Sequence, residues 1–180
     1  MTYTYILTKA DHVTYLLHNA STKKSVKKQL SSSWAWISLA FTLIGILFYL
    51  SQDTALAITF FGIAITAFLF YPYYLKQRYV KHYTKHVNEV YKDKDATSVY
   101  MEITDDELIA GTDKGESKIR LSAIENIAET GQHLFVYISG GQGLIIPKTI
   151  PDFNAIKSDM ESIAKRLKIP YQTDLEWRWK

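Results

Sequence analysis

Four basic side chains in the C-terminal half are the residues best suited to bind a charged ligand. They are Lys114, Lys118, Arg120 and Lys148. Clustered cations of this kind can attract the anionic headgroups of a lipid surface. Residues 95–180 nevertheless contain ten basic and 14 acidic side chains, which gives this segment a net charge of −4. The default interpretation is therefore a solvated face, with anionic-lipid or partner binding as the alternative.

Two histidines have a spacing that can hold a metal. His82 and His86 lie four residues apart, and Glu89 follows three residues later. On a helix, two such imidazoles can share a zinc ion. The sequence HYTKH lacks the internal Glu of the zinc-protease motif, and no third ligand is evident elsewhere in the sequence. We therefore expect polar helix residues here, and predict neither a metal nor another cofactor.

The sequence offers little support for catalysis. There is no cysteine, which excludes a thiol nucleophile and thiolate metal sites. No serine lies in a GxSxG context. The glycine-rich stretch GGQG at 140–143 joins two predicted strands, whereas a phosphate-binding loop should open a helix. We expect a hairpin turn with glycine at positive φ, no catalytic residues, and a protein that is not an enzyme.

The C-terminal sequence DLEWRWK carries two further candidates for a partner contact, Trp177 and Trp179. In a strand, both indoles would point to the same side. They can cover the domain's own sheet, touch a membrane interface or bind a partner. Docking onto the domain itself is the favoured interpretation.

Two uncharged apolar runs dominate the N-terminal half. No charged residue lies in the 24 positions between Lys28 and Asp53, or in the 22 between Asp53 and Lys76. About 20 helical residues cross a hydrocarbon core. We predict a transmembrane hairpin over 33–75, with spans at 33–50 and 54–75. A buried hairpin in a soluble protein is the alternative, but the remaining chain is short for covering two such helices.

Basic residues flank the outer ends of these runs, and the turn between them has none. The predicted juxtamembrane anchors are Lys23, Lys24, Lys27, Lys28, Lys76, Arg78 and Lys81. The positive-inside rule then predicts a two-span protein of the cell membrane with both termini cytoplasmic. No charge lies inside either span, which favours an anchor over a channel or transporter. The net charge of +3 arises from these flanks, so no nucleic-acid partner is expected.

The remaining sequence predicts a small α+β domain. Residues 1–32 read as a strand followed by a helix, in which Thr8 and Asp11 resemble a capping box. Residues 76–94 predict a basic juxtamembrane stem helix. Within 95–180, period-two patterns predict six strands at 98–104, 107–112, 115–121, 124–130, 133–139 and 143–147, followed by a helix at 152–168. With the N-terminal strand, we expect a pleckstrin-homology-like sandwich of about seven strands closed by a C-terminal helix.

Three stretches of the sequence carry a family resemblance: ILTKADHVTYLLHNAS near the start, ITDDELIAGTDKGESKIRLSAIENIAETGQHLFVYI in the middle, and LIIPKTIPDFNAIKSDMESIAKRL at the end. This resemblance is to YcxB-like bacterial membrane proteins. Its most specific pieces are ELI, IxxIxET and IIPK. The resemblance implies a fold and a topology, and carries no activity.

The expected function is that of a membrane-anchored interaction or regulatory module. Its predicted partners are the lipid bilayer and another protein, and a homo-oligomer is a further possibility. Two alternatives remain open at this point. One is a phosphoinositide-like or anionic-lipid-sensing domain, and the other is immunity or self-protection against a membrane-active peptide or toxin.

Overall fold

The computed structural model describes residues 2–92, 95–113 and 115–179. They form two compact units. The sheet unit contains the residues up to Tyr15 and those from His86 to Arg178. The hairpin unit contains Leu16 to Lys85 together with Trp179.

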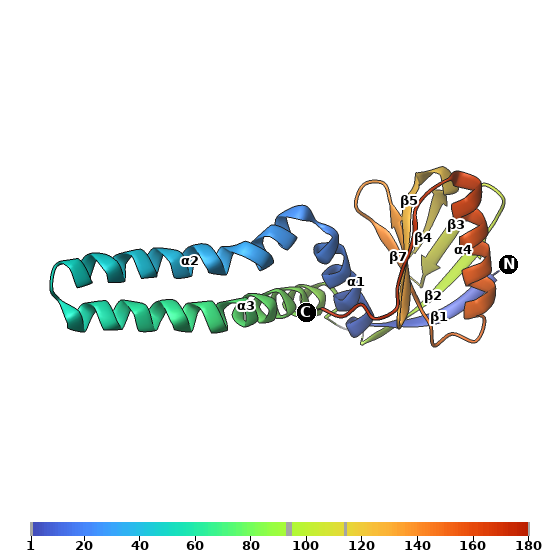
Figure 1. Cartoon of the computed structure of the whole chain (residues 1–180). Coiled ribbons are helices and arrows are strands. Elements are labelled where there is room, and N and C mark those ends of the chain that lie inside the picture. The colour runs from blue at the N-terminus through green and yellow to red at the C-terminus, as the bar shows by residue number, and fades with distance from the viewer. Residues whose placement is uncertain (1, 93–94, 114, 180) are drawn as a thin grey trace. The chain divides into compact units, whose positions relative to one another are not determined.

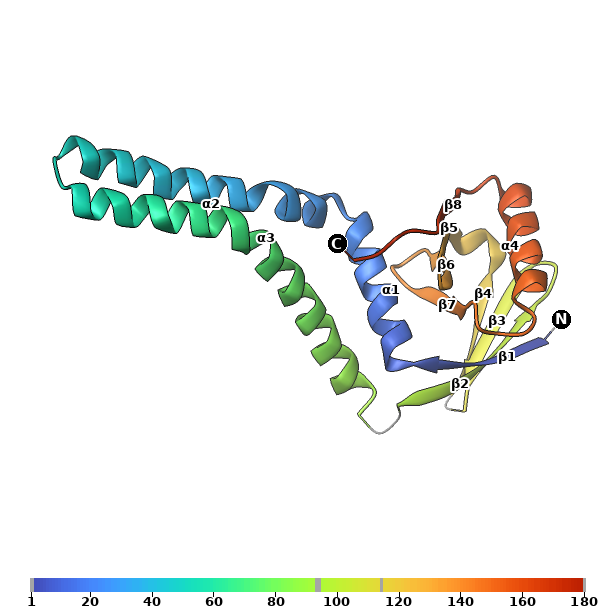
Figure 2. The ribbon, with the colours of Figure 1, turned by 60° about the horizontal axis from the view of Figure 1, so that its bottom comes forward.

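The sheet unit has two four-stranded sheets, so the predicted mixture of helix and sheet is confirmed (Figure 2). The first sheet has the order β1 (Thr2–Thr8), β2 (Ala96–Ile103), β3 (Glu107–Thr112) and β4 (Gly115–Arg120). The second has the order β7 (Gly143–Pro147), β6 (His133–Ile138), β5 (Ile124–Thr130) and β8 (Tyr171–Asp174). A single 3₁₀ turn, Leu121–Ala123, connects the two sheets.

The described residues contain one more strand than expected. β8 is four residues long and pairs in parallel with β5, from Ile127↔Tyr171 to Thr130↔Asp174. Its sequence, YQTD, has no apolar alternation, so its pattern did not predict a strand. β8 ends at Asp174, and the two C-terminal tryptophans therefore lie outside any strand.

β1 joins the two sequence segments that build the sheet unit. All seven of its residues pair with β2, from Thr2↔Glu102 to Thr8↔Ala96. Tyr3, Tyr5 and Leu7 are buried and the residues between them are exposed, as period-two alternation requires. The chain thus leaves this ladder at one end for the helices and returns to the same end of it.

The core of the sheet unit lies between the sheets and α4 (Phe153–Leu167). Ile156 and Met160 of α4 are fully buried, one helical turn apart on one face. Met101 and Leu108 from the first sheet, and Phe135 from the second, are equally inaccessible to solvent. Burying large apolar side chains of this kind contributes about 1.5–3 kcal/mol each.

The hairpin unit contains two helices that are long and apolar enough to cross a membrane. α1 (Lys9–Thr22) leads to α2 (Lys24–Leu50), and α3 (Thr54–Val90) follows the turn. α2 begins nine residues before the apolar run at 33, so the run and its basic flank share one helix. α3 likewise contains the second apolar run and residues 76–90 of the predicted basic stem, with Pro72 inside it. Residues 93 and 94 of the predicted stem lie outside the described residues.

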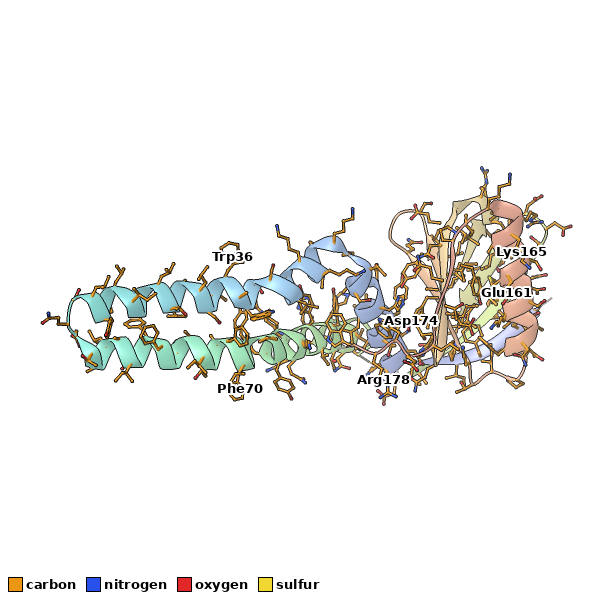
Figure 3. All side chains as sticks on the ribbon, in the orientation of Figure 1. Trp36, Phe70, Glu161, Lys165, Asp174 and Arg178 are labelled. Atoms are coloured by element: carbon orange, nitrogen blue, oxygen red, sulfur yellow. The ribbon has the colours of Figure 1, made fainter. Side chains whose placement is uncertain are left out.

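Aromatic side chains line the contact between α2 and α3, which lie side by side (Figure 1). Trp34 meets Phe68 edge to face at 4.6 Å between ring centroids, and Phe48 stacks on Phe60 at 5.3 Å. Gly45 allows close approach, since a Cβ there would lie 2.8 Å from the Phe61 ring. Trp36 and Phe70 point away from the paired helices (Figure 3). The outer surface of the hairpin is therefore apolar.

Candidate functional site

A buried carboxylate, Glu129, is the centre of a polar cluster in the sheet unit. The Glu129 side chain is 3% exposed. Lys148 Nζ donates to its Oε1 at 2.6 Å, and Lys157 Nζ lies 2.9 Å from its Oε2. The Tyr171 hydroxyl donates to Oε2 at 3.0 Å. One carboxylate therefore connects β5, the residue after β7, α4 and β8.

These contacts determine the ionisation of the cluster. Burial alone would raise the pKa of Glu129, but the hydrogen bonds from the two lysines and Tyr171 outweigh it and hold the pKa below the usual value. Burial, together with the bond to Glu129, raises the pKa of Tyr171. Glu129 is therefore charged and Tyr171 neutral at physiological pH. The arrangement holds elements together, because one carboxylate joins side chains from separate elements.

A second polar cluster fixes the start of α1. The Thr8 backbone N–H and hydroxyl both donate to Asp11 Oδ2 at 2.7 Å, which confirms the predicted capping box. His133 Nε2–H donates to Asp11 Oδ1 at 2.7 Å, and its ring stacks on Phe135. Burial would raise the pKa of Asp11, but the bonds from His133 and Thr8 hold it below the usual value. This cluster attaches α1 to β6.

The two chain segments that lead into and out of the helices meet within the sheet unit. Lys9 Nζ forms a 2.8 Å ion pair with Asp95, and the Lys9 N–H donates to the Asp95 carbonyl. His12 stacks on Tyr91 with 4.4 Å between ring centroids. These contacts continue the β1–β2 ladder onto the adjoining residues.

The structure divides the predicted basic patch between the two sheets. Lys118 and Arg120 lie on β4, where Lys118 is 3.8 Å from Glu116. Lys148 follows β7 in the other sheet and forms an ion pair with Glu129. Lys114 lies outside the described residues. The described members of the patch therefore do not converge on one ligand.

The two C-terminal tryptophans have different surroundings. Trp179 Nε1–H donates to the Lys76 carbonyl at 3.3 Å, and its ring meets Tyr79 edge to face at 5.7 Å. Both contacts lie within the hairpin unit. The Trp177 N–H donates to the Asp174 carbonyl in the turn after β8. Neither side chain is fully exposed.

The predicted juxtamembrane basic residues lie on α2 and α3, or directly before α2. Lys23 is the residue before α2, and Lys24, Lys27 and Lys28 lie in its first turns. Lys76, Arg78 and Lys81 lie along α3 beyond Pro72. All of these residues except Lys76 are well exposed.

The GGQG segment and the histidine pair are two further features of the sequence. Gly140 and Gly141 have φ values of 90° and 82°, which confirms the glycine-dependent hairpin turn. His82 and His86 are exposed on α3. Among the residues that the structure describes, no group of three His, Cys, Asp or Glu side chains is placed to hold a metal ion.

A groove that the sequence did not predict lies between the β2–β3 turn and α4. Two hollows of about 520 and 460 Å³ share Asp105 and Arg166, and we call them together the Asp105 groove. Arg166 Nη2 donates to the Asp105 carbonyl at 2.8 Å and separates the hollows. The first is lined also by Thr104, Asp159 and Ile163, and the second by Asp106, Glu107, Arg120 and Leu121.

Comparison with known protein families gives a match in the central part of the sheet unit. Residues 103–150 match the family model of YcxB-like proteins. The predicted resemblance is confirmed for this segment. The YcxB-like segment contains both Glu129 and Lys148, so the ion pair connects the IxxIxET and IIPK pieces on which the resemblance rests. No curated protein and no solved structure matches the chain.

Sequence reasoning missed Glu129, His133 and Arg166 as organising residues. The sequence carried no clear signal for Glu129, because the burial of four consecutive residues from Ile127 to Thr130 is seen only in the structure. An acid in a strand covered on both faces must have cationic partners. The partners themselves lie far along the chain, and no local pattern marks them.

Proposed function

We propose that this protein is a non-enzymatic interaction or regulatory module anchored in the cell membrane by its helical hairpin. The observation that carries the proposal is the β1–β2 ladder. Its strands come from both sides of the helices, so the hairpin is an insertion within one folded domain. An anchor built in this way cannot detach from the sheets without breaking a seven-residue ladder.

The proposed topology has two spans with both termini and the sheet unit in the cytoplasm. The apolar outer surface of α2 and α3 supports membrane insertion, because large apolar side chains such as Trp36 and Phe70 face outward. The seven basic anchors at the far ends of the hairpin support the orientation. Asp53, the only acid between Lys28 and Lys76, lies in the turn.

The proposed sheet architecture is a pleckstrin-homology-like sandwich. Support comes from the strand order, in which β1 to β4 form one sheet and β5 to β7 form most of the other, followed by α4. Sandwiches of this kind commonly present binding surfaces. A binding role also suits polar clusters that hold strands and helix in place rather than act on a substrate.

The proposal is tested by recovering a partner from the native membrane. The tagged full-length chain, expressed at its native level, is cross-linked in cells and purified in detergent. We expect one membrane or membrane-associated protein to be enriched over a control that contains the hairpin with an unrelated cytoplasmic domain. Equal recovery by both proteins would contradict a specific interaction role.

Lipid sensing is the alternative function, and a separate liposome measurement distinguishes it from protein binding. It would give liposome binding that depends on Lys118 and Arg120 and persists without a protein partner. Lys148 is paired with Glu129 and lies away from Lys118 and Arg120, which favours protein binding over lipid sensing.

A further inference from the structure

The Asp105 groove has an excess of negative charge. Its lining includes four acids, Asp105, Asp106, Glu107 and Asp159, against two cations, Arg120 and Arg166. Arg166 donates its hydrogen bond to the Asp105 carbonyl rather than to a carboxylate. Among the described residues, the exposed carboxylates of Asp105 and Asp106 have no ion-pair partner. The groove therefore attracts cations.

The shape of the groove favours a chain segment over a single ion. The two hollows adjoin on either side of Arg166, so a ligand that fills both must be extended. The linings of the first and second hollow each include an apolar side chain, Ile163 and Leu121 respectively. The absence of a metal-holding group among the described residues argues against a lone divalent cation. An elongated groove lined by acids suits a peptide that carries lysine or arginine.

The side chains that form the groove are held in place. Tyr3 donates to Asp159 Oδ2 at 3.2 Å, which fixes this acid between β1 and α4. Thr104 and Glu107 close the turn with three hydrogen bonds, at 2.8, 2.9 and 3.1 Å, so Asp105 and Asp106 lie in an ordered turn. A preformed surface binds a ligand with a smaller ordering cost.

We propose that the Asp105 groove docks a basic juxtamembrane segment of another membrane protein. This inference rests on the proposed function, which puts the sheet unit on the cytoplasmic side. Lysine and arginine are concentrated in the cytoplasmic segments next to membrane spans, so such segments lie within reach of an anchored domain. Complementary charge would steer the encounter and make it sensitive to salt.

The test measures peptide binding to the full-length protein in neutral detergent. The probe is a fluorescent peptide of alternating lysine and alanine, followed by anisotropy at low salt. We expect the double substitution D105N/D106N to weaken binding about threefold to tenfold, since exposed charge pairs contribute modestly. Asparagine keeps the preference for the turn, and a thermal melt verifies that the variant is folded.

A matched control separates the groove from the acidic surface as a whole. E125Q/E176Q removes the same charge from two exposed positions outside the groove and should leave binding unchanged. R166Q removes the cation between the hollows and should strengthen binding about twofold. Equal weakening by both double variants, or no binding to the wild-type protein, would overturn the inference.

Partner recovery distinguishes failure of this inference from failure of the proposed function. If the D105N/D106N protein still recovers the wild-type partner in full, the interaction role stands and the groove is not its site. If the peptide binds the groove but no partner is ever enriched, the interaction role fails and the groove chemistry remains. Loss of both peptide and partner on the same substitution supports the two proposals together.

Discussion

Glu129 joins four parts of the sheet unit through one carboxylate. Its lysine partners keep part of their surface in water, with side-chain exposures of 22% and 35%. Only the carboxylate has fully left solvent, so its charge depends on Lys148, Lys157 and Tyr171. A buried charge of this kind costs free energy unless its partners remain in place.

Removing the charge of Glu129 while keeping its shape should destabilise the sheet unit. We expect E129Q to lower the free energy of unfolding by about 2 kcal/mol, because two ammonium groups lose their shared counter-ion but can still turn toward water. Thermal unfolding of the full-length protein in detergent measures the effect. E125Q, at an exposed position of the same strand, should change stability by less than about 0.5 kcal/mol. Similar losses in both variants would show that Glu129 has no special role.

Acid should weaken the fold through Asp11 and Glu129. Both have a folded-state pKa below the usual values of 3.8 and 4.5, so the unfolded state binds protons first as the pH falls. Their contribution to stability is complete well above pH 4.5 and declines as the pH falls through these values and then through the lower folded-state pKa. Melting temperatures measured between neutral and acid pH should show this decline. E129Q should show a shallower one, and identical slopes would contradict the assignment.

At the scale of elements, one glycine of β7, Gly143, lets α1 pack closely against that strand. The Tyr15 ring of α1 lies against Gly143, where a Cβ would clash with the Tyr15 hydroxyl. Tyr15 also packs on Phe135 and Tyr137 of β6, so the ring cannot move freely. Its buried hydroxyl has no hydrogen-bond partner among the described residues. A close fit therefore holds Tyr15 on the sheet, in addition to the His133–Asp11 hydrogen bond nearer the start of α1.

Adding a methyl group at Gly143 should break that fit. We expect G143A to destabilise the protein by about 1–3 kcal/mol through overpacking. Y15F removes the clashing hydroxyl and should be neutral or slightly stabilising, and it should rescue part of the loss in the double variant. Unfolding measurements on the two single variants and the double variant give the coupling energy.

An open glycine provides the control for the Gly143 substitution. A Cβ at Gly115 of β4 meets no atom within 4 Å, so G115A should be tolerated. If G115A costs as much as G143A, backbone conformation rather than the Tyr15 contact explains the loss.

At the scale of the whole molecule, the chain folds one domain from two separated segments. Residues of β1 precede the helices and those of β2 follow them, and Lys9 and Asp95 continue the pairing. Whichever side of a membrane holds the C-terminal strands must also hold the N-terminus. The hairpin turn at Gln52 then lies on the opposite side if both helices cross.

A reporter inserted at Gln52 tests this topology. We expect the insertion to be accessible from outside the cell, while tags at the two termini are accessible only after permeabilisation. Gln52 already has a φ of 62° in the turn, so an insertion there should disturb neither helix. A cytoplasmic reporter at Gln52 would contradict both the orientation and the two-span anchor.

The sequence by itself determined the elements whose signals are local. Uncharged runs identified α2 and α3, alternation identified β1 to β7, and spacing identified α4 and the Thr8–Asp11 cap, because each signal lies within a few turns or residues of chain. The same reasoning did not predict β8, because a short polar strand depends on its neighbour β5 for pairing.

Only the tertiary structure decided how distant side chains meet. Lys148 resembled a surface cation in the sequence, yet it neutralises Glu129, which lies 19 residues earlier. His133 and Asp11 are 122 residues apart and share one hydrogen bond. Asp105 and Arg166 divide a groove whose walls come from a turn and a helix. Such contacts depend on the register and packing of whole elements, and an amino-acid pattern records only the propensity of each element alone.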